Sequence, residues 1–268
     1  MTGVASIMKI GSMDGSLAQP WERLFEVAAK IGFEGVELGV GEDYSQTKLW
    51  KEEGRRELKA LSKASNVVIA SICIHSYWRF SFAGSEGKIS RTAHEIAEEA
   101  AAIAHEIGAR NLLIPVTSAE GVTAEEARKR WIEGIKSCAD TAEGYGVVYA
   151  LENVGQPFAT TGKQLASIVD EINSPAVKVY YDPGNAIYKN LNPLEDIRVL
   201  SGRISQVHMK DPGGDHLGEG KMDIPSVIKA LKAINYNGWI MLETPETDDP
   251  IKASEMNLKY LRRLLLMI

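Results

Sequence analysis

Residues 177–211 read VKVYYDPGNAIYKNLNPLEDIRVLSGRISQVHMKD and contain the pattern that decides the fold. Val177–Tyr181 is a short apolar run rich in Val and Tyr, as expected for a buried strand. From Pro193 to Leu200 apolar residues return every three or four positions, which is typical of an amphipathic helix. Ile204–Met209 is a second apolar run. Strand, helix and strand in this order make one repeat of a parallel α/β sheet.

The same alternation recurs along the whole chain. The sequence predicts eight strands, near Lys9–Gly11, Gly35–Leu38, Val67–Ile74, Asn111–Ile114, Val147–Leu151, Val177–Tyr181, Ile204–Met209 and Gly238–Leu242. It predicts eight helices between and after them, near Ala18–Ile31, Lys48–Ser65, Arg91–Ile107, Ala124–Tyr145, Gly162–Ile172, Pro193–Leu200, Ile224–Ile234 and Pro250–Met267. No Pro/Gly-rich linker separates the repeats, and no glycine motif of a dinucleotide-binding or P-loop type is present. We therefore expect a closed (β/α)8 TIM barrel that forms a single domain over residues 1–268.

Several predicted helix ends carry residues that satisfy free backbone groups. Two pairs fit the capping-box spacing, Asn-Pro precedes one helix, and a glycine follows three others where a left-handed exit is wanted. These positions are Thr123 with Glu126, Thr161 with Gln164, Asn192 with Pro193, and Gly32, Gly108 and Gly146.

Composition narrows the possible partners. The chain has 268 residues and a formal net charge of −6, whereas a nucleic-acid binder needs a broad basic face, so we expect no nucleic-acid partner. Apolar stretches such as 67–74 are far shorter than the roughly 20 residues that cross a bilayer, which predicts no membrane span. The first residues lack the pattern of a secretory signal, which predicts a cytoplasmic protein. Cys73 and Cys138 form neither a close metal pair nor a disulfide framework and are expected to be buried thiols.

Polar side chains mark the ends of four consecutive predicted strands. They are Glu152, Asp182, His208 and Glu243. Taken singly, each is explained as a capping or salt-bridging residue of a loop, but the ends of barrel strands all face one mouth, so we expect the four to meet. Three crowded carboxylates repel one another unless a cation lies between them. Three oxygens and one imidazole nitrogen suit a hard divalent ion, so the sequence predicts one metal site, with Mn²⁺ expected and Mg²⁺ or Co²⁺ as alternatives.

Five segments carry a resemblance to a known superfamily: ALEN at 150–153, YYDPGNA at 180–186, QVHMKD at 206–211, LGEGKMDIPSVIKAL at 217–231 and YNGWIMLE at 236–243. With them the chain resembles, over essentially its full length, the xylose-isomerase-like barrel superfamily of sugar isomerases and epimerases, which also contains endonuclease IV. Residues 192–211 are similar to the hexulose- and pentulose-phosphate epimerase branch. The four strand-end residues match the metal ligands of tagatose 3-epimerase-like enzymes, which implies that Glu152, Asp182, His208 and Glu243 bind the metal.

The resemblance also implies a reaction. A metal-dependent isomerase or epimerase removes a proton next to the carbonyl of a sugar or sugar phosphate, through an enediolate that the metal stabilises. Two carboxylates on opposite sides of the sugar then invert the carbon, and Glu152 and Glu243 are the candidate catalytic pair.

Candidate substrate contacts come from the other strand ends. His75 is expected to bind a sugar hydroxyl with Trp78 as an apolar wall, and Glu37 is expected to orient His75 or bind a hydroxyl. Lys210 is expected to neutralise an enolate or to pair with Asp211 or Glu243.

The resemblance fails at three positions. Tagatose-epimerase-like enzymes carry a substrate-contacting His and Arg where this chain has Asn185 and Gly214, and a further Glu where it has Phe158. A specific hexose is therefore not transferred. Asn153, Asn185, Lys210 and His216 are expected to recognise the substrate instead.

Other function classes stay open at this point. One is a lyase similar to inosose dehydratase, acting on a keto-sugar or keto-inositol at the same metal site. More distant is DNA repair as in endonuclease IV, which needs a three-zinc cluster with more than the five histidines present. A non-catalytic carbohydrate-binding barrel is a further alternative. We expect a small sugar or sugar phosphate as partner, and relatives that are dimers or tetramers suggest self-association.

Overall fold

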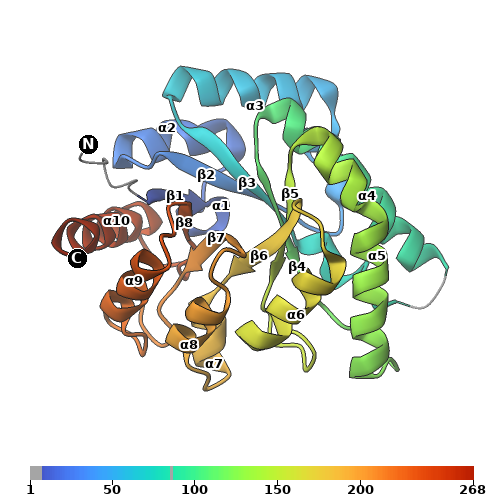
Figure 1. Ribbon diagram of the computed structural model, residues 1–268. Helices are drawn as coiled ribbons and strands as arrows, with labels where there is room; N and C mark the ends of the chain where they lie inside the picture. Colours follow the sequence, from blue (N-terminus) through green and yellow to red (C-terminus); the bar gives the residue numbers. More distant parts are fainter. Residues whose placement is uncertain (1–7, 85–86) are drawn as a thin grey trace, which may run out of the picture.

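The computed structural model describes residues 8–84 and 87–268 and confirms the barrel. All neighbouring strands run parallel, and the closed sheet has the order β1 to β8 (Figure 1). The strands are β1 Lys9–Met13, β2 Gly35–Val40, β3 Val68–Ile74, β4 Asn111–Pro115, β5 Val148–Glu152, β6 Val177–Tyr181, β7 Ile204–Met209 and β8 Trp239–Leu242.

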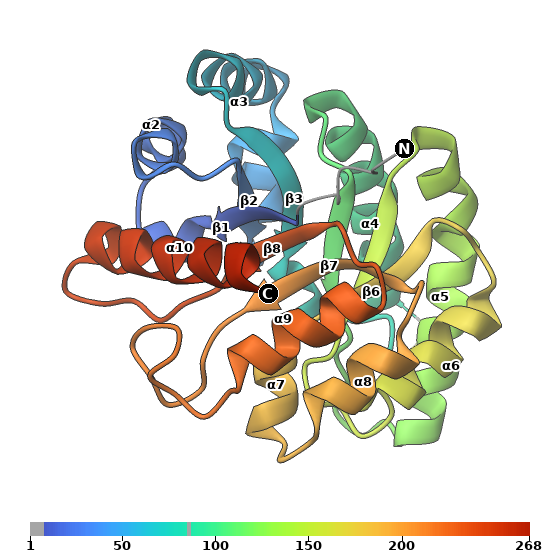
Figure 2. The ribbon, with the colours of Figure 1, turned by 60° about the vertical axis from the view of Figure 1, so that its left-hand side comes forward.

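Helices surround the sheet. They are α1 Asp14–Leu17, α2 Trp21–Ile31, α3 Glu52–Ser65, α4 Lys88–Ile107, α5 Ala124–Tyr145, α6 Gly162–Ile172, α7 Pro183–Tyr188, α8 Pro193–Val199, α9 Ile224–Ala233 and α10 Pro250–Met267, with short 3₁₀ turns η1 Tyr44–Gln46, η2 Lys48–Trp50 and η3 His75–Trp78. β8 pairs with β1 from Lys9↔Trp239 to Ser12↔Leu242, which closes the barrel. The last helix, α10, packs against α1 and α2, so the last βα repeat lies beside the first (Figure 2).

Two apolar cores result from the alternation of side chains along each strand. In β2 the even-numbered Val36, Leu38 and Val40 point outward and belong to the large core under the helices. A second, smaller core fills the barrel itself, with members such as Cys73, Ala150, Tyr180 and Met241. Gly11 makes room for this filling, because a Cβ there would lie 2.6 Å from the Met241 Cε.

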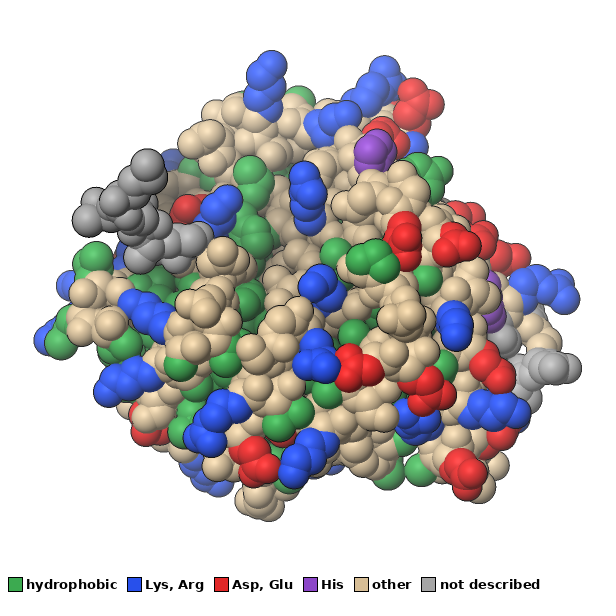
Figure 3. All heavy atoms as spheres, viewed as in Figure 1, with side chains coloured by type: hydrophobic (Ala, Val, Ile, Leu, Met, Phe, Trp, Pro, Cys, Tyr) green, Lys and Arg blue, Asp and Glu red, His purple; other side chains and the backbone are tan. Residues whose placement is uncertain are grey.

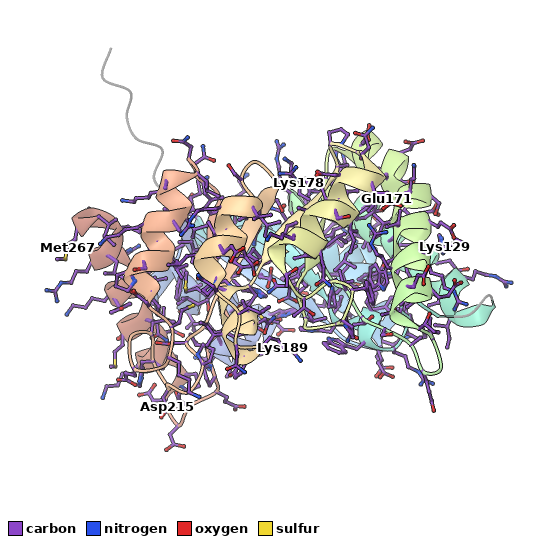
Figure 4. All side chains as sticks on the ribbon, turned by 60° about the horizontal axis from the view of Figure 1, so that its bottom comes forward. Lys129, Glu171, Lys178, Lys189, Asp215 and Met267 are labelled. Atoms are coloured by element: carbon purple, nitrogen blue, oxygen red, sulfur yellow. The ribbon has the colours of Figure 1, made fainter. Side chains whose placement is uncertain are left out.

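Because all the strands are parallel, their carboxyl ends lie together at one end of the barrel. In Figure 4 Lys178, near the start of β6, lies toward the upper edge, and Lys189 and Asp215, beyond the ends of β6 and β7, lie toward the lower edge. The carboxyl ends of the strands therefore open at the lower edge of that view. We refer to this end of the barrel as the mouth.

Most predicted helix ends are confirmed. Thr161 and Gln164 form a complete capping box, and the side chain of Asn192 accepts from the Leu194 N–H. Gly32, Gly108 and Gly146 all have the left-handed conformation. At Thr123 half of the expected box is present: its hydroxyl accepts from the Glu126 N–H, whereas the Glu126 carboxylate pairs with Arg130.

Two predicted helices begin later than the sequence indicates, and a further helix lies where none was predicted. The helix expected over 18–31 is interrupted, because Ala18 takes a left-handed conformation and Pro20 precedes the new start at Trp21. The helix expected from Lys48 begins at Glu52, after the turn η2. The short helix α7 was not predicted, since its six residues are too few for a recognisable period.

The surface carries charges of both signs. Lys and Arg side chains occur together with Asp and Glu over the face seen in Figure 3. Among the helices of residues 8–84 and 87–268, none combines the length and apolarity needed to span a membrane. Cys73 and Cys138 are both free and buried, as predicted.

The capping box of α6 gives a stability prediction. Thr161→Ala leaves the Gln164 N–H without its side-chain acceptor and should lower the free energy of unfolding by about 1 kcal/mol. Lys163→Ala, in the same turn, removes a side chain that is 74% exposed and should cost less than about 0.5 kcal/mol. Urea denaturation of both variants checks this, and equal losses would contradict the assigned cap.

Candidate active site and metal centre

Glu152, Asp182, His208 and Glu243 come together at the mouth of the barrel. Each offers one ligand atom, and these four atoms lie within 4.8 Å of one another. Glu152 ends β5, Asp182 follows β6, His208 is the fifth residue of β7, and Glu243 follows β8. The first three are buried, while 29% of the Glu243 side chain is exposed. The cluster therefore has one side that opens toward solvent.

The turn after β6 fixes Asp182. Its Oδ1 accepts from the Asn185 N–H at 3.0 Å, as the cap of α7. The Asn153 amide donates to the carbonyl of Asp182 and accepts from its N–H, at 2.8 and 2.9 Å. Asn153 thus positions a cluster residue from the adjacent strand end.

A buried carboxylate holds His208 from below. Glu37 Oε1 accepts from His208 Nε2 at 2.7 Å, so that Nδ1 faces the cluster, 3.3 Å from Glu152 Oε1 and 3.2 Å from Glu243 Oε2. The second oxygen of Glu37 accepts from the Tyr180 and Ser71 hydroxyls. Metal-binding histidines commonly present one nitrogen to the ion while a carboxylate binds the other.

This buried network extends further into the barrel. Gln206 donates to both the Ser71 Oγ and the Tyr180 hydroxyl, at 2.7 and 2.9 Å. Asn111 donates to Gln206 at 2.8 Å. The carboxylate of Glu37 is thereby anchored to strands β3, β4, β6 and β7 and has little freedom to move.

Lys210 completes the cluster. Its Nζ lies 2.7 Å from Asp182 Oδ2 and 2.7 Å from Glu243 Oε2. The ammonium group therefore neutralises two carboxylates of the site. Asp211, the other partner expected from the sequence, instead accepts from backbone N–H groups of residues 218, 220 and 222.

Burial and charge act against each other here. Burial raises the pKa of Glu152 to about 7, although His208 opposes the shift. Burial also raises the pKa of Asp182. Burial favours a higher pKa at Glu243 as well, but the charges of His208 and Lys210 outweigh this effect and lower the pKa of Glu243. Burial alone would lower the pKa of His208, but the negative charges of Glu243 and Glu37 raise this pKa well above its ordinary range.

The four donors fit a divalent ion. With metal–oxygen distances of about 2.1 Å, donors on opposite sides of one ion lie roughly 4.2 Å apart, close to the present spacing. Asp182 Oδ2 is buried and its near neighbour is the Lys210 ammonium at 2.7 Å, so this oxygen is directed into the cluster. Three oxygens and one nitrogen are donors that Mn²⁺, Mg²⁺ and Co²⁺ accept.

A family model described as "Xylose isomerase-like TIM barrel" matches residues 25–264. The chain belongs to the xylose isomerase-like TIM barrel family. Among similar proteins, the L-ribulose-5-phosphate 3-epimerase UlaE of Escherichia coli is 26% identical over 240 residues, which cover 86% of this chain and 84% of UlaE.

Solved structures agree with this assignment at the level of the fold. An L-ribulose 3-epimerase superposes with a TM-score of 0.85 at 16% identity, covering 97% of this chain and 95% of that one. The D-allulose 3-epimerase of Methylomonas sp., in complex with D-allulose, gives 0.83 at 18% identity, covering 96% and 97%. At these identities the likeness shows the fold alone.

In this xylose isomerase-like barrel, two predicted substrate contacts have different surroundings from those expected. Glu37 is fully buried under His208 and orients that residue, so it supports the site and does not face the mouth beside His75. The polar atoms of Asn153 are used on the backbone of Asp182. Both arrangements have the same cause: a polar group buried in the barrel binds the nearest buried partner. Substrate contacts by Glu37 and Asn153 stay predictions.

The remaining predicted contacts lie around the mouth. Asn185 Nδ2 is 3.5 Å from Glu152 Oε1, and His75 lies half-buried above Cys73. Trp78 is 57% exposed. His216 pairs with Glu219 and lines a surface hollow together with Asp215 and Glu246, apart from the four-residue cluster.

The position where related enzymes carry arginine has no room for one in this barrel. A Cβ at Gly214 would lie 2.6 Å from the Gly220 nitrogen, because the loop folds back on itself around Asp211. Phe158 is buried. Neither position therefore offers the polar side chain that the resemblance implies.

Sequence reasoning missed the network under the site. Tyr180 and Gln206 each lie two residues before a cluster residue, Asp182 and His208, and so point to the same side of their strands. A polar residue two positions before a predicted ligand was the available signal.

Removing the charge under His208 should weaken metal binding. Glu37→Gln keeps the size of the side chain but not its charge, and loss of such a supporting carboxylate typically lowers metal affinity about 10- to 100-fold. Titration calorimetry with Mn²⁺ measures the change. Glu42→Gln, an exposed carboxylate beyond the same strand, is the matched control and should bind as the wild type does. Equal affinity in Glu37→Gln would show that the contact is not needed.

Lys210→Met leaves Asp182 and Glu243 without their cation. The metal-free variant should lose about 3 kcal/mol of unfolding free energy, because an unpaired buried carboxylate remains. Saturating Mn²⁺ should remove most of the difference from the wild type, since the ion replaces the missing charge. Thermal unfolding with and without Mn²⁺ tests this, and a loss that Mn²⁺ does not reduce would refute the proposed site.

Proposed function

We propose that this protein is a metal-dependent epimerase of a sugar or sugar phosphate. The observation that carries the proposal is the convergence of Glu152, Asp182, His208 and Glu243 at the mouth of the barrel. Support comes from the relatives, because UlaE, matched over most of both chains, is named as an L-ribulose-5-phosphate 3-epimerase.

The four residues of the cluster would hold the ion, with Mn²⁺ as the proposed metal. When bound, the ion would act as a Lewis acid that polarises the sugar carbonyl and makes the neighbouring C–H more acidic. Glu37 would keep His208 oriented toward it, and Lys210 would balance the remaining negative charge: three carboxylates face one divalent cation and one ammonium group.

Glu152 and Glu243 are the proposed acid/base pair. They come from strands separated by β6 and β7, so their carboxylates approach the centre of the mouth from different directions. One carboxylate takes the proton from carbon, and the electron pair of the C–H bond moves toward the carbonyl oxygen. The other, in its protonated form, returns a proton to the opposite face, which inverts the carbon.

Substrate contacts by His75, Trp78, Asn185, Lys210 and His216 remain predictions, as do a cytoplasmic location and self-association. Of these residues, Asn185 and Lys210 have the most direct contact with the cluster. Their amide and ammonium groups are suited to donate hydrogen bonds to sugar oxygens.

Exchange with solvent tests the reaction. Incubation of ketoses and ketose phosphates in D₂O with Mn²⁺ should place deuterium on the carbon next to the carbonyl and give the epimer. Glu152→Gln and Glu243→Gln should each lower the rate at least about 100-fold, because a proton-transfer group is lost.

Glu246→Gln, an exposed carboxylate in the loop after β8, is the control and should keep full activity. Retention of epimerisation in both cluster variants would contradict the mechanism. Loss of water from the substrate, seen by mass, would instead indicate a lyase.

A further inference from the structure

Glu243 lies just beyond the regular sheet. The last pairs of β8 join Leu242 to Ser12 of β1 and to Met209 of β7, so both ladders end one residue before Glu243. On the β7 side the Glu243 N–H still donates to the Met209 carbonyl, at 3.1 Å. On the β1 side the strand has ended, because the chain turns into α1 after Met13. The backbone that carries Glu243 therefore needs another partner on that side.

A buried hydroxyl of α1 supplies this partner. Ser16 Oγ accepts from the Thr244 N–H at 2.8 Å and lies 3.2 and 3.3 Å from the carbonyl oxygens of Thr244 and Leu242, to which it donates. A hydroxyl has one proton and two lone pairs, so a single side chain can both accept from and donate to this stretch. Ser16 is 4% exposed. Its side chain thus does for residues 242–244 what a neighbouring strand does for the rest of β8.

The helix that carries Ser16 is itself anchored. Asp14, at the start of α1, accepts from the Gly39 N–H at 3.0 Å and from Trp21 Nε1 at 2.7 Å, which ties α1 to the end of β2. The Ser254 hydroxyl of α10 donates to the Ser16 carbonyl at 3.4 Å. Helix α1 therefore contacts the ends of both strands that flank β1, and it presents a fixed hydroxyl to the end of β8.

The position of the Glu243 carboxylate depends closely on this backbone. Glu152 and His208 lie within strands and Asp182 caps α7, whereas Glu243 follows a strand and its side chain is 29% exposed. A displacement of about 1 Å in a reacting geometry can lower a rate about 100-fold. Small movements of residues 242–244 would therefore be felt at the cluster.

We propose that Ser16 is a positioning residue for Glu243: its hydroxyl fixes the backbone on both sides of that residue and so sets where the carboxylate lies in the cluster. The proposal rests on the proposed function, in which Glu243 binds the metal and belongs to the acid/base pair. Ser16 acts through the backbone of residues 242–244 and not by its own contact with the ion or the sugar.

Ser16→Ala tests the proposal, because it removes the hydroxyl and leaves the Thr244 N–H without its acceptor. Titration calorimetry measures the affinity for Mn²⁺, and deuterium exchange into ketoses and ketose phosphates at saturating Mn²⁺ measures kcat and KM. We expect the Mn²⁺ affinity and kcat each to fall about 10- to 100-fold, since a support of a ligand is lost. KM should change less than about twofold, because binding of the sugar itself is not altered.

Ser254→Ala is the matched control. It removes another buried hydroxyl from the contact between α1 and α10, but one that donates to the Ser16 carbonyl and not to the backbone around Glu243. Its Mn²⁺ affinity and kcat should equal those of the wild type, even where urea denaturation shows a loss of stability. Ser16→Cys has a weak donor and acceptor, so it should fall between Ser16→Ala and the wild type. It also provides the measurement if the alanine variant does not fold.

Wild-type Mn²⁺ affinity and kcat in Ser16→Ala would overturn the proposal. An equal loss in Ser254→Ala would overturn it too, because the effect would then come from a general weakening of the contact between α1 and α10. A wild-type protein that binds Mn²⁺ without exchanging deuterium into any ketose would refute the epimerase function. In that case a Mn²⁺ affinity lowered in Ser16→Ala but not in Ser254→Ala would still support the positioning of Glu243.

Discussion

Three carboxylates share one rim of the barrel, and their negative charge is the constraint on which the rest of the mouth depends. Lys210 lies 2.7 Å from Asp182 and from Glu243. His208 Nδ1 lies 3.3 Å from Glu152 and 3.2 Å from Glu243. Burial makes each ionised group costly without a partner. The charges of His208 and Lys210, with Glu37 beneath, therefore hold in place a cluster that would otherwise repel itself.

The interior of the barrel holds apolar and polar side chains together. Apolar side chains such as Met241 fill the space left by glycine. Ser71, Tyr180 and Gln206 form a hydrogen-bonded network that fixes Glu37. Glu37 in turn holds His208 of the cluster at the mouth. Groups that hold the site are thus part of the barrel core, so packing and ligand geometry depend on the same side chains.

The sequence was sufficient for the fold and for the cluster. Eight successive βα repeats all indicate the same architecture, a parallel barrel. In such a barrel the carboxyl ends of the strands converge whatever the details of the loops. This is why Glu152, Asp182, His208 and Glu243 could be brought together without coordinates.

The hydrogen-bond and ion-pair partners of individual side chains at the site could not be predicted in the same way. The partner of Glu37, and the choice between Asp211 and Glu243 as the partner of Lys210, depend on the rotamers and depth of residues from several strands, and a period-two pattern gives only the side of the strand. Helix α7 is set by the Asp182 cap and Pro183 in a segment too short to show periodicity. Helix α1 was missed because its four residues, between the predicted strand at 9–11 and the predicted helix at 18–31, are too few to show a period.

Asp211 has a consequence for altering the enzyme. Its buried carboxylate receives the N–H groups of residues 218, 220 and 222, and so ties the loop after β7 to the strand that carries His208 and Lys210. Transplanting this loop from a relative, as a route to new sugar preferences, must retain an acidic side chain at 211. Without that tether the grafted segment would be free to swing over the mouth, and its sequence would no longer determine the shape presented to the sugar.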